Sequence, residues 1–309
     1  MSATPNGPAV SDAVVSATAL PAAADLEAGR RWTTGDVMLL DASGGRAARV
    51  QAAGQDLRDG GNLWRLAAVL AWLDIRLRYR GSALGPIWLT LSSAVMVGSM
   101  GFIYGTLFHT VLRDYLPFLA VSIIVWQAGL QGLVGEACTV FVDAEPMIRS
   151  MRMPFTLQVL RSVMRNLIVL AHNLVVPIGV FAIFDAWPGW EALLALPGLL
   201  LWMADGVACG FLLGSICARF RDVPPIVGSV MQIAFYVTPI VWKPAQLGRH
   251  GWWLPFNPFY DLLELVRGPI LGGAPPPLVW GAALGYSLLL WAAAWFVFIR
   301  ARPRLAFWV

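Results

Sequence analysis

Charged side chains are scarce in this sequence. They make up 13% of the 309 residues, whereas hydrophobic residues make up 58%, and a typical soluble domain is about 25% charged. Because so few charges cannot cover a soluble protein of this length, the composition excludes an ordinary soluble domain and indicates an integral membrane protein. The small net charge of +4 then reflects loops that face an anionic leaflet, and we expect no nucleic-acid partner.

Side chains that carry chemistry are also few. The three cysteines are an odd number without Cys-x-x-Cys spacing, which argues against a disulfide framework and against a zinc site. The three histidines share no metal-ligand spacing with a carboxylate. The sequence has no Gly-x-Ser-x-Gly motif, no paired acidic motif and no glycine-rich phosphate loop. We therefore expect no catalytic residue, no metal, no cofactor and no ATP-hydrolysing machinery in this chain.

Long apolar runs are what the sequence has instead. About 20 helical residues cross the roughly 30 Å hydrocarbon core of a bilayer. Runs of that kind lie at about 87–109, 115–141, 155–184, 192–218, 226–242 and 278–299. The predicted fold class is thus an all-α integral membrane protein with six transmembrane helices, which form a domain over residues 84–304.

The distribution of arginine predicts the sidedness of these spans. Basic residues prefer cytoplasmic loops, and the two short turns assigned to the outside contain only Arg113. The segments assigned to the cytoplasm hold Arg149, Arg152, Arg219, Arg221, Arg300, Arg302 and Arg304. Both termini, including a short C-terminal tail at 305–309, are therefore predicted to be cytoplasmic.

The residues before the first span divide into two parts. Residues 1–60 are rich in Ala, Gly, Asp and Pro without a sustained apolar period, which is typical of a flexible tail. Residues 61–83 approximate an amphipathic helix, with tryptophans and arginines suited to the membrane surface. We predict an interface helix there.

The stretch 243–277 is exceptional, because it is too apolar for a plain loop and too broken by Pro and charge to span. Non-helical backbone at membrane depth is tolerated only against protein or a water-filled cavity. We interpret it as two short re-entrant helices, about 244–254 and 258–271, between spans five and six. The alternative is a helical hairpin that lies on the outer leaflet.

Two acidic residues lie within predicted spans and are functional candidates by default. Glu136 is close to the cytoplasmic edge, where it can snorkel or pair with Arg161 or Arg165. Asp205 is nearer the middle of its span and has no obvious partner in the sequence.

Six motifs occur in one order over about residues 57–304. They are RYRGSALGPIW, AEPMIRSMRMP, LRSVMRNLIVLAHNLVV, ARFRDV, YVTPIVW and FNPFYDLLELVRGPILGG. Together they resemble the membrane subunits of type-2 ABC exporters for lipid-linked polysaccharides, the O-antigen and capsule exporters. The tail before residue 57 is longer than expected for that family.

The resemblance implies a transport subunit of the bacterial inner membrane that is not itself an enzyme. Two copies of the subunit pair with two copies of a cytoplasmic ATPase, which binds ATP and Mg²⁺, and they move a lipid-linked polysaccharide outward. The segment 142–154 becomes the coupling helix that contacts the ATPase, and 219–223 a second contact. The residues implied in this coupling are Asp143, Glu145, Arg149, Arg152, Arg221 and Asp222.

The resemblance also implies gates and a channel wall. Leu84 and Gly85 fall in the loop that the family uses where lipid enters from the cytoplasmic leaflet. The outer gate includes Asn257, Pro258, Tyr260 and Arg267. Aromatic residues line the family's translocation path, and the candidates are Phe102, Tyr104, Phe108, Phe235 and Tyr236; the alternative for each is a lipid-facing or packing role.

Arg76, Arg78 and Arg80 precede the Leu84–Gly85 break. Alternate positions lie about 200° apart on a helix, so the three do not share a face. We expect Arg78 and Arg80, with Tyr79 between them, to meet a substrate phosphate, because planar guanidinium groups bind phosphate bidentately. The alternative is that they only anchor the helix to anionic lipid.

Other substrates and other classes of membrane protein are also compatible with parts of the pattern. O-antigen is favoured, while capsular polysaccharide and teichoic-type polymers stay open. A membrane-embedded enzyme acting on polyprenyl lipids would show convergent acids or histidines at a membrane face. A secondary transporter would show paired repeats with broken helices in both halves.

Overall fold

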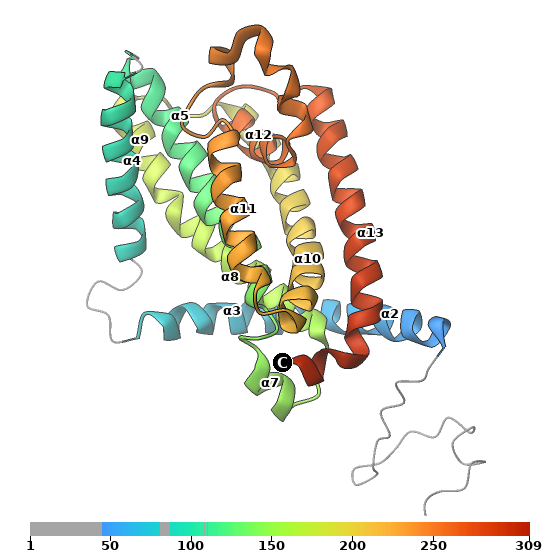
Figure 1. Ribbon diagram of the computed structural model, residues 1–309. Helices are drawn as coiled ribbons and strands as arrows, with labels where there is room; N and C mark the ends of the chain where they lie inside the picture. The colour runs from blue at the N-terminus through green and yellow to red at the C-terminus, as the bar shows by residue number, and fades with distance from the viewer. Residues whose placement is uncertain (1–44, 81–86, 108, 110) are drawn as a thin grey trace, which may run out of the picture. The chain divides into compact units, whose positions relative to one another are not determined.

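The computed structural model describes residues 45–80, 87–107, 109 and 111–309, which belong to one compact unit, Gly44–Val309. All regular secondary structure in these residues is helical. Long apolar helices run alongside one another, and shorter helices lie at their two ends (Figure 1). The predicted all-α membrane class is therefore confirmed.

Five stretches of the described chain are long and apolar enough to cross a bilayer. They are α4 (Ile87–Leu107), α5 with η1 and α6 (Leu112–Ile124, Val125–Gln131, Gly132–Thr139), α8 with α9 (Phe155–Asn173, Val175–Phe184), η2 with α10 (Trp190–Leu194, Ala195–Arg219), and α13 (Pro277–Trp308). They correspond to the first four predicted spans and to the last.

The predicted fifth span corresponds to α11 (Val223–Val237). Its 15 residues extend about 22 Å at 1.5 Å per residue, less than the roughly 30 Å hydrocarbon core. The chain then leaves the helix at Thr238, whose backbone is extended. The apolar run was thus located correctly, but only part of it is helical.

Helix α10 is the central packing element, in contact with α6, α8, α12 and α13. Its glycines allow these neighbours to come close: a Cβ at Gly206 would lie 2.7 Å from Leu133, and one at Gly198 would lie 2.8 Å from the carbonyl oxygen of Leu265. Small residues at helix contacts are the usual packing device in membranes, where the lipid is as apolar as the side chains.

Burial is uneven among the long helices. The stretch α5–η1–α6 is largely inside, with Trp126 fully buried against Phe235 and Phe259. By contrast, α11 buries only Met231, and most of α4 is exposed. Most of the exposed residues of these two helices are apolar, which suits contact with lipid or with another membrane-embedded surface.

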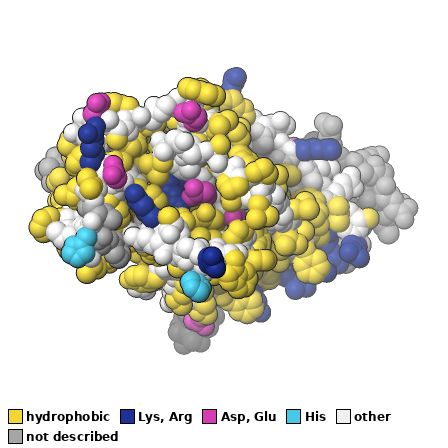
Figure 2. All heavy atoms as spheres, turned by 90° about the horizontal axis from the view of Figure 1, so that it is seen from above, with side chains coloured by type: hydrophobic (Ala, Val, Ile, Leu, Met, Phe, Trp, Pro, Cys, Tyr) yellow, Lys and Arg dark blue, Asp and Glu magenta, His cyan; other side chains and the backbone are white. Residues whose placement is uncertain are grey.

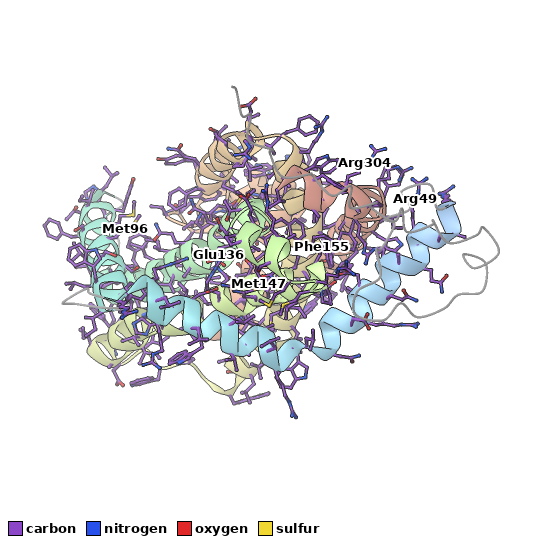
Figure 3. The ribbon with its side chains drawn as sticks, turned by 90° about the horizontal axis from the view of Figure 1, so that it is seen from below. Arg49, Met96, Glu136, Met147, Phe155 and Arg304 are labelled. Atoms are coloured by element: carbon purple, nitrogen blue, oxygen red, sulfur yellow. The ribbon has the colours of Figure 1, made fainter. Side chains whose placement is uncertain are left out.

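The short helices gather at opposite ends (Figure 1). One end has α2 (Arg46–Asn62), α3 (Trp64–Arg78) and α7 (Glu145–Ser150), and the other has η3 (Pro244–Phe256) and α12 (Pro258–Ile270). Figure 2 looks onto the end with η3, where charged side chains are scattered among hydrophobic ones. Figure 3 looks onto the other end, where α2 and α3 lie across the ends of the long helices.

Helix α3 buries two alanines and an isoleucine and exposes its two tryptophans. Ala67, Ala71 and Ile75 face the protein, whereas Trp64 and Trp72 are 52% and 53% exposed. This is the reverse of a soluble amphipathic helix, whose large apolar residues point inward. The amphipathic pattern therefore serves a close contact with α8 on one side and an apolar outer surface on the other.

Two boundaries differ from the sequence analysis. Helix α2 covers residues 46–60 at the end of the range 1–60 that was assigned to the tail. The sequence pattern did not reveal it, because its buried face consists of Ala53, Asp56 and Gly60, which give no apolar period. Helix α13 continues to Trp308 through the range assigned to a C-terminal tail. It does so because Leu305 is fully buried in a cluster that also contains Ala53.

Candidate functional site

Four charged side chains form a cluster where α3 crosses the long helices. Arg161 of α8 pairs with Asp74 of α3 through two hydrogen bonds, one of them 2.7 Å from Nε to Oδ2. Arg165, one turn further along α8, lies 3.1 Å from both Asp74 and Glu136. The sequence analysis named two possible partners for Glu136, and the structure selects Arg165. The cluster joins α3, α6 and α8.

The charges of this cluster favour an ionised Asp74. Burial by itself raises the pKa of the carboxyl group. The hydrogen bonds and positive charges of Arg161 and Arg165 outweigh that effect and hold the pKa of Asp74 below its usual range. Helix α3 is therefore attached to α8 by a charged, hydrogen-bonded contact.

A polar cavity of about 410 Å³ lies beside this cluster. Asp74, Arg161 and Arg165 line it, together with Arg78 from the last turn of α3 and Asp143 from the α6–α7 connection. Arg78 forms no ion pair with the residues that the structure describes. The structure thus distinguishes Arg78, which lines the cavity, from Arg80, which is exposed beyond the end of α3 and does not.

The predicted coupling segment contains a short helix, α7. Glu145 and Arg149 pair along it at 2.9 Å, and Asp143 accepts a hydrogen bond from Thr139 at 2.7 Å. Arg149 also donates to the main-chain oxygen of Val309 at 2.6 Å. The remaining predicted coupling residues, Arg152, Arg221 and Asp222, are exposed. Figure 3 shows Met147 of α7 and Phe155 of α8 near the middle of this end.

The channel-wall candidates do not behave alike. Phe102 and Tyr236 are 67% and 68% exposed, on α4 and α11. Tyr104 and Phe235 are half-buried against the largest core cluster. Phe108 lies outside the described residues, as do Leu84 and Gly85.

The predicted outer-gate stretch divides at Asn257, close to the predicted break. The Asn257 side chain caps α12 by accepting from the backbone amides of Phe259 and Tyr260, and it donates to Thr238 Oγ1 at 3.0 Å. Pro258 is the first residue of α12, a position that suits proline because its missing N–H has no helical partner. The cap therefore joins α12 to the segment after α11.

Arg267 of α12 is almost completely buried, with 1% of its surface exposed. Its guanidinium group pairs with Glu264 and donates to Ser122 Oγ of α5 at 3.1 Å. It also donates to the carbonyl oxygen of Pro239, and it lies 4.8 Å from the Phe118 ring centroid. One side chain thus connects α12, α5 and the end of α11.

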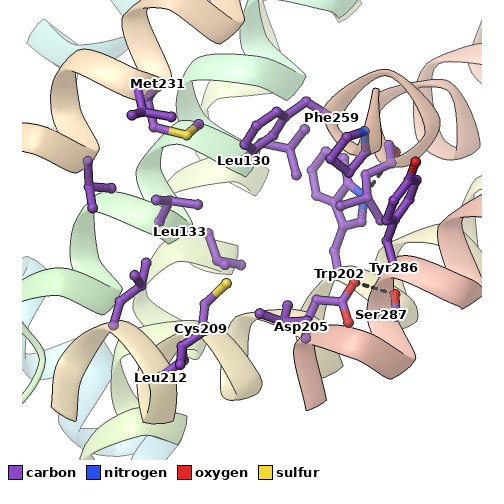
Figure 4. Close-up of a pocket in the computed structure, with 17 residues that line it drawn as sticks. Leu130, Leu133, Trp202, Asp205, Cys209, Leu212, Met231, Phe259, Tyr286 and Ser287 are labelled. Atoms are coloured by element: carbon purple, nitrogen blue, oxygen red, sulfur yellow. Dashed lines mark hydrogen bonds between the residues drawn. The ribbon is translucent and has the colours of Figure 1, made fainter. Parts of the chain in front are cut away.

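Two further acids are buried near α12 and α10. Asp261 is fully buried, and neither carboxyl oxygen has a hydrogen-bond partner among the described residues. Asp205 lines an apolar cavity of about 420 Å³ and accepts a 2.7 Å hydrogen bond from Ser287 of α13 (Figure 4). The sequence pattern did not single out Ser287, because its partner Asp205 comes from another helix. It also did not single out Asp261 and Glu264, which lie in α12 with Arg267.

Residues 65–271 match the family described as ABC-2 type transporter. The chain belongs to this family. It is therefore the membrane subunit of an ABC transporter and not an enzyme, and its family implies an ABC ATPase as partner. Neither the membrane-embedded enzyme nor the secondary transporter is favoured.

This ABC-2 subunit is also similar to named relatives. It is 26% identical over 233 residues to the O-antigen export system permease protein RfbA of Myxococcus xanthus, covering 72% of this chain and 86% of the relative. It is 20% identical over 217 residues to RfbA of Klebsiella pneumoniae, covering 69% of this chain and 83% of the relative. The predicted resemblance to the O-antigen export family is thereby confirmed.

Proposed function

We propose that this chain forms the membrane path of an ATP-driven exporter of lipid-linked polysaccharide, with O-antigen as the glycan. Its family and the names of its relatives support this. In the proposed complex, two copies pair with two copies of a cytoplasmic ABC ATPase, which binds ATP and Mg²⁺. The complex lies in the bacterial inner membrane with both termini of this chain in the cytoplasm.

The cavity beside α3 is the observation that best supports a lipid-linked, anionic substrate. Arg78 lines it without an ion-pair partner among the described residues, next to two arginines that Asp74 holds in place. Trp64 and Trp72 on the outer side of α3 favour a position at the lipid–water interface. An anionic lipid headgroup at that depth meets a planar guanidinium group that binds phosphate bidentately. Tyr79 and Arg80 follow Arg78 directly in the chain and belong to the proposed headgroup site, and the entry gate of the proposal includes Leu84 and Gly85, which lie outside the described residues.

The coupling contacts of the proposal are α7 and the turn between α10 and α11. Both lie at the same end as α2 and α3 (Figure 1), and Arg149, Arg152, Arg221 and Asp222 are exposed there. An ATPase that docks on this end contacts the connections after the second and fourth long helices. Movement of the ATPase is then transmitted to the long helices through these connections.

The translocation path of the proposal uses the exposed apolar helices. We assign α11 as the fifth of six spans, completed by the non-helical segment after Val237, and we place the exposed Phe102 and Tyr236 on the channel wall. Aromatic faces stack on the apolar faces of sugar rings. Helices η3 and α12 re-enter the membrane as the outer gate, because irregular backbone at that depth is tolerated against protein.

The test begins with cells that lack this chain. We expect them to lose surface glycan and to accumulate its lipid-linked form, and mass spectrometry of lipid that copurifies with the complex identifies the carrier. Unchanged surface glycan would contradict the proposed function.

The headgroup site is tested with Arg78→Lys, which keeps the charge but loses the planar fork. We expect export and substrate-stimulated ATPase activity to fall about tenfold, the effect of losing one charge-assisted hydrogen bond. Arg58→Lys on the exposed side of α2 is the matched control, with membrane level and ATPase assembly measured for both. Export at the parental rate in Arg78→Lys would show that Arg78 only anchors the helix.

A further inference from the structure

Asp56 of α2 caps a helix that begins 99 residues later. Helix α8 starts after Pro154, which provides no side-chain cap. The Asp56 carboxylate instead accepts from the backbone amide of Thr156 at 3.0 Å, from the Thr156 hydroxyl at 2.8 Å and from the backbone amide of Phe155 at 3.3 Å. These amides are among the first four of a helix, which have no partner within it. The negative charge also suits the positive end of the α8 dipole.

A second ion pair joins the same carboxylate to α13. Arg302 Nε lies 3.1 Å from Asp56 Oδ2, and the Asp56 side chain is only 2% exposed. One turn further along α2, a Cβ at Gly60 would clash with the Thr156 side chain and lie 3.0 Å from the Leu157 nitrogen. Helix α2 is thus pressed onto the first turn of α8, and α13 is attached at the same point.

This junction lies next to the coupling segment. Only residues 151–154 separate α7 from α8, and Gln158 in the first turns of α8 donates to the sulfur of Met147 in α7 at 2.9 Å. On its other side, α7 reaches the end of α13 through the bond from Arg149 to Val309. Helix α7 therefore contacts the two helices that Asp56 holds together.

We propose that Asp56 is a positioning residue for energy coupling, which holds the start of α8 and the cytoplasmic part of α13 as one body so that displacement of α7 moves both. This rests on the proposed role of α7 in contacting the ATPase. Without Asp56, a push on α7 bends the 151–154 connection and separates the first turn of α8 from α13. ATP hydrolysis then continues while less substrate is moved per ATP.

The experiment uses the full complex with its ATPase partner and compares Asp56→Ala, Asp56→Asn and Arg302→Gln. Asp59→Asn and Arg304→Gln are the matched controls, because both residues are exposed on the same two helices. The measurements are assembly with the ATPase, ATP hydrolysis, glycan exported per ATP, and hydrogen exchange of the amides at 155–157. A purely stabilising role would lower the amount of assembled complex but not the export per ATP.

We expect Asp56→Ala to increase exchange at 155–157 and to lower export per ATP about tenfold in assembled complex. Asp56→Asn and Arg302→Gln should give a smaller loss, and their combination should be no worse than either alone, because both remove one ion pair. Unchanged export per ATP in Asp56→Ala would overturn the proposal. If the Asp56→Ala complex does not assemble, Arg302→Gln provides the test, because this variant leaves the α8 cap intact. Unchanged export per ATP in Arg302→Gln would equally overturn the proposal.

A separate variant distinguishes this inference from the proposed function. Glu145→Arg with Arg149→Glu reverses the charges of α7 and should uncouple ATP hydrolysis from export. If this variant is uncoupled and the Asp56 and Arg302 variants are not, the junction proposal fails and the role of α7 stands. If it exports normally, the role of α7 fails, and with it the reason to assign Asp56 to coupling.

Discussion

Replacing Arg267 with methionine tests whether one buried arginine holds α12 against α5 and the segment after α11. Methionine fills much of the same volume but removes the charge and every donor. Glu264, whose side chain is 21% exposed, then loses its ion pair. The Ser122 hydroxyl and the Pro239 carbonyl lose the hydrogen bonds that they share with the guanidinium group.

The structure gives the size of this effect. Removing one partner of a buried ion pair costs about 3–5 kcal/mol, because the other charge is left uncompensated. We expect the lower end, about 3 kcal/mol, since Glu264 retains some contact with solvent. At about 2–4 °C per kcal/mol for a domain of this size, the apparent melting temperature should fall by roughly 6–12 °C.

The double variant Arg267→Met with Glu264→Gln separates the ion pair from general packing. It removes both charges, so only the neutral carbonyl and hydroxyl groups are left without this donor, at about 1–2 kcal/mol. The double variant should therefore recover about one third to two thirds of the loss. Arg249→Met is the matched control, because Arg249 is exposed on η3 and should change the free energy of unfolding by less than about 0.5 kcal/mol.

Thermal unfolding of purified protein in lipid nanodiscs measures these differences. The reasoning is refuted if the single and double variants melt at the same temperature, since the uncompensated charge would then carry no cost. It is equally refuted if Arg267→Met melts within about 2 °C of the parent.

Two further predictions follow from buried groups. Burial raises the pKa of Asp261 from 3.8 to about 7, so between these pH values the folded state binds more protons than the unfolded state and stability falls as pH rises. Asp261→Asn should therefore raise the melting temperature at pH 8 and have little effect at pH 4. An equal effect at both pH values would contradict the assignment. Gly198→Ala should lower the free energy of unfolding by about 1–3 kcal/mol, because the new Cβ would lie 2.8 Å from the Leu265 backbone. The control Gly228→Ala, whose Cβ would have no neighbour within 4 Å, should be neutral or stabilise α11 by up to about 1 kcal/mol. Similar melting shifts in the two variants would argue against close packing of α10 on α12.

The long helices could be predicted because the hydrophobicity of each segment is sufficient to place it in the membrane as a helix. An apolar run inserts in a bilayer as a single segment, and its backbone hydrogen bonds are satisfied within it. The predicted second and third spans accordingly differ from the observed helices by at most a few residues. Only α11 fell short, because Pro239 and the extended backbone at Thr238 interrupt an apolar run that hydropathy reads as continuous.

Part of the candidate site was also accessible from the sequence. Arg165 was one of two arginines expected as possible partners of Glu136, because Glu136 lies close to the cytoplasmic edge of its predicted span, and the structure pairs it with Arg165. The polar segment around α7 was identified because charges between two apolar runs cannot be in hydrocarbon. The buried role of Asp56 was not accessible, since it lies in a polar helix whose partners are 99 to 246 residues away.

Sequence alone was sufficient to predict the membrane class, the position of the apolar runs, the polar segments between them and, through the motifs, the family. These properties depend on the transfer of single segments between water and lipid, which is a local quantity. Only the packed structure shows which polar groups each charge contacts: Asp74 pairs with two arginines of α8, Arg267 donates to Ser122 of α5, and Asp56 contacts the start of α8 and Arg302 of α13. Such pairs are formed between helices that are far apart in sequence, because a charge removed from water is stabilised only by a partner that packing brings within hydrogen-bonding distance.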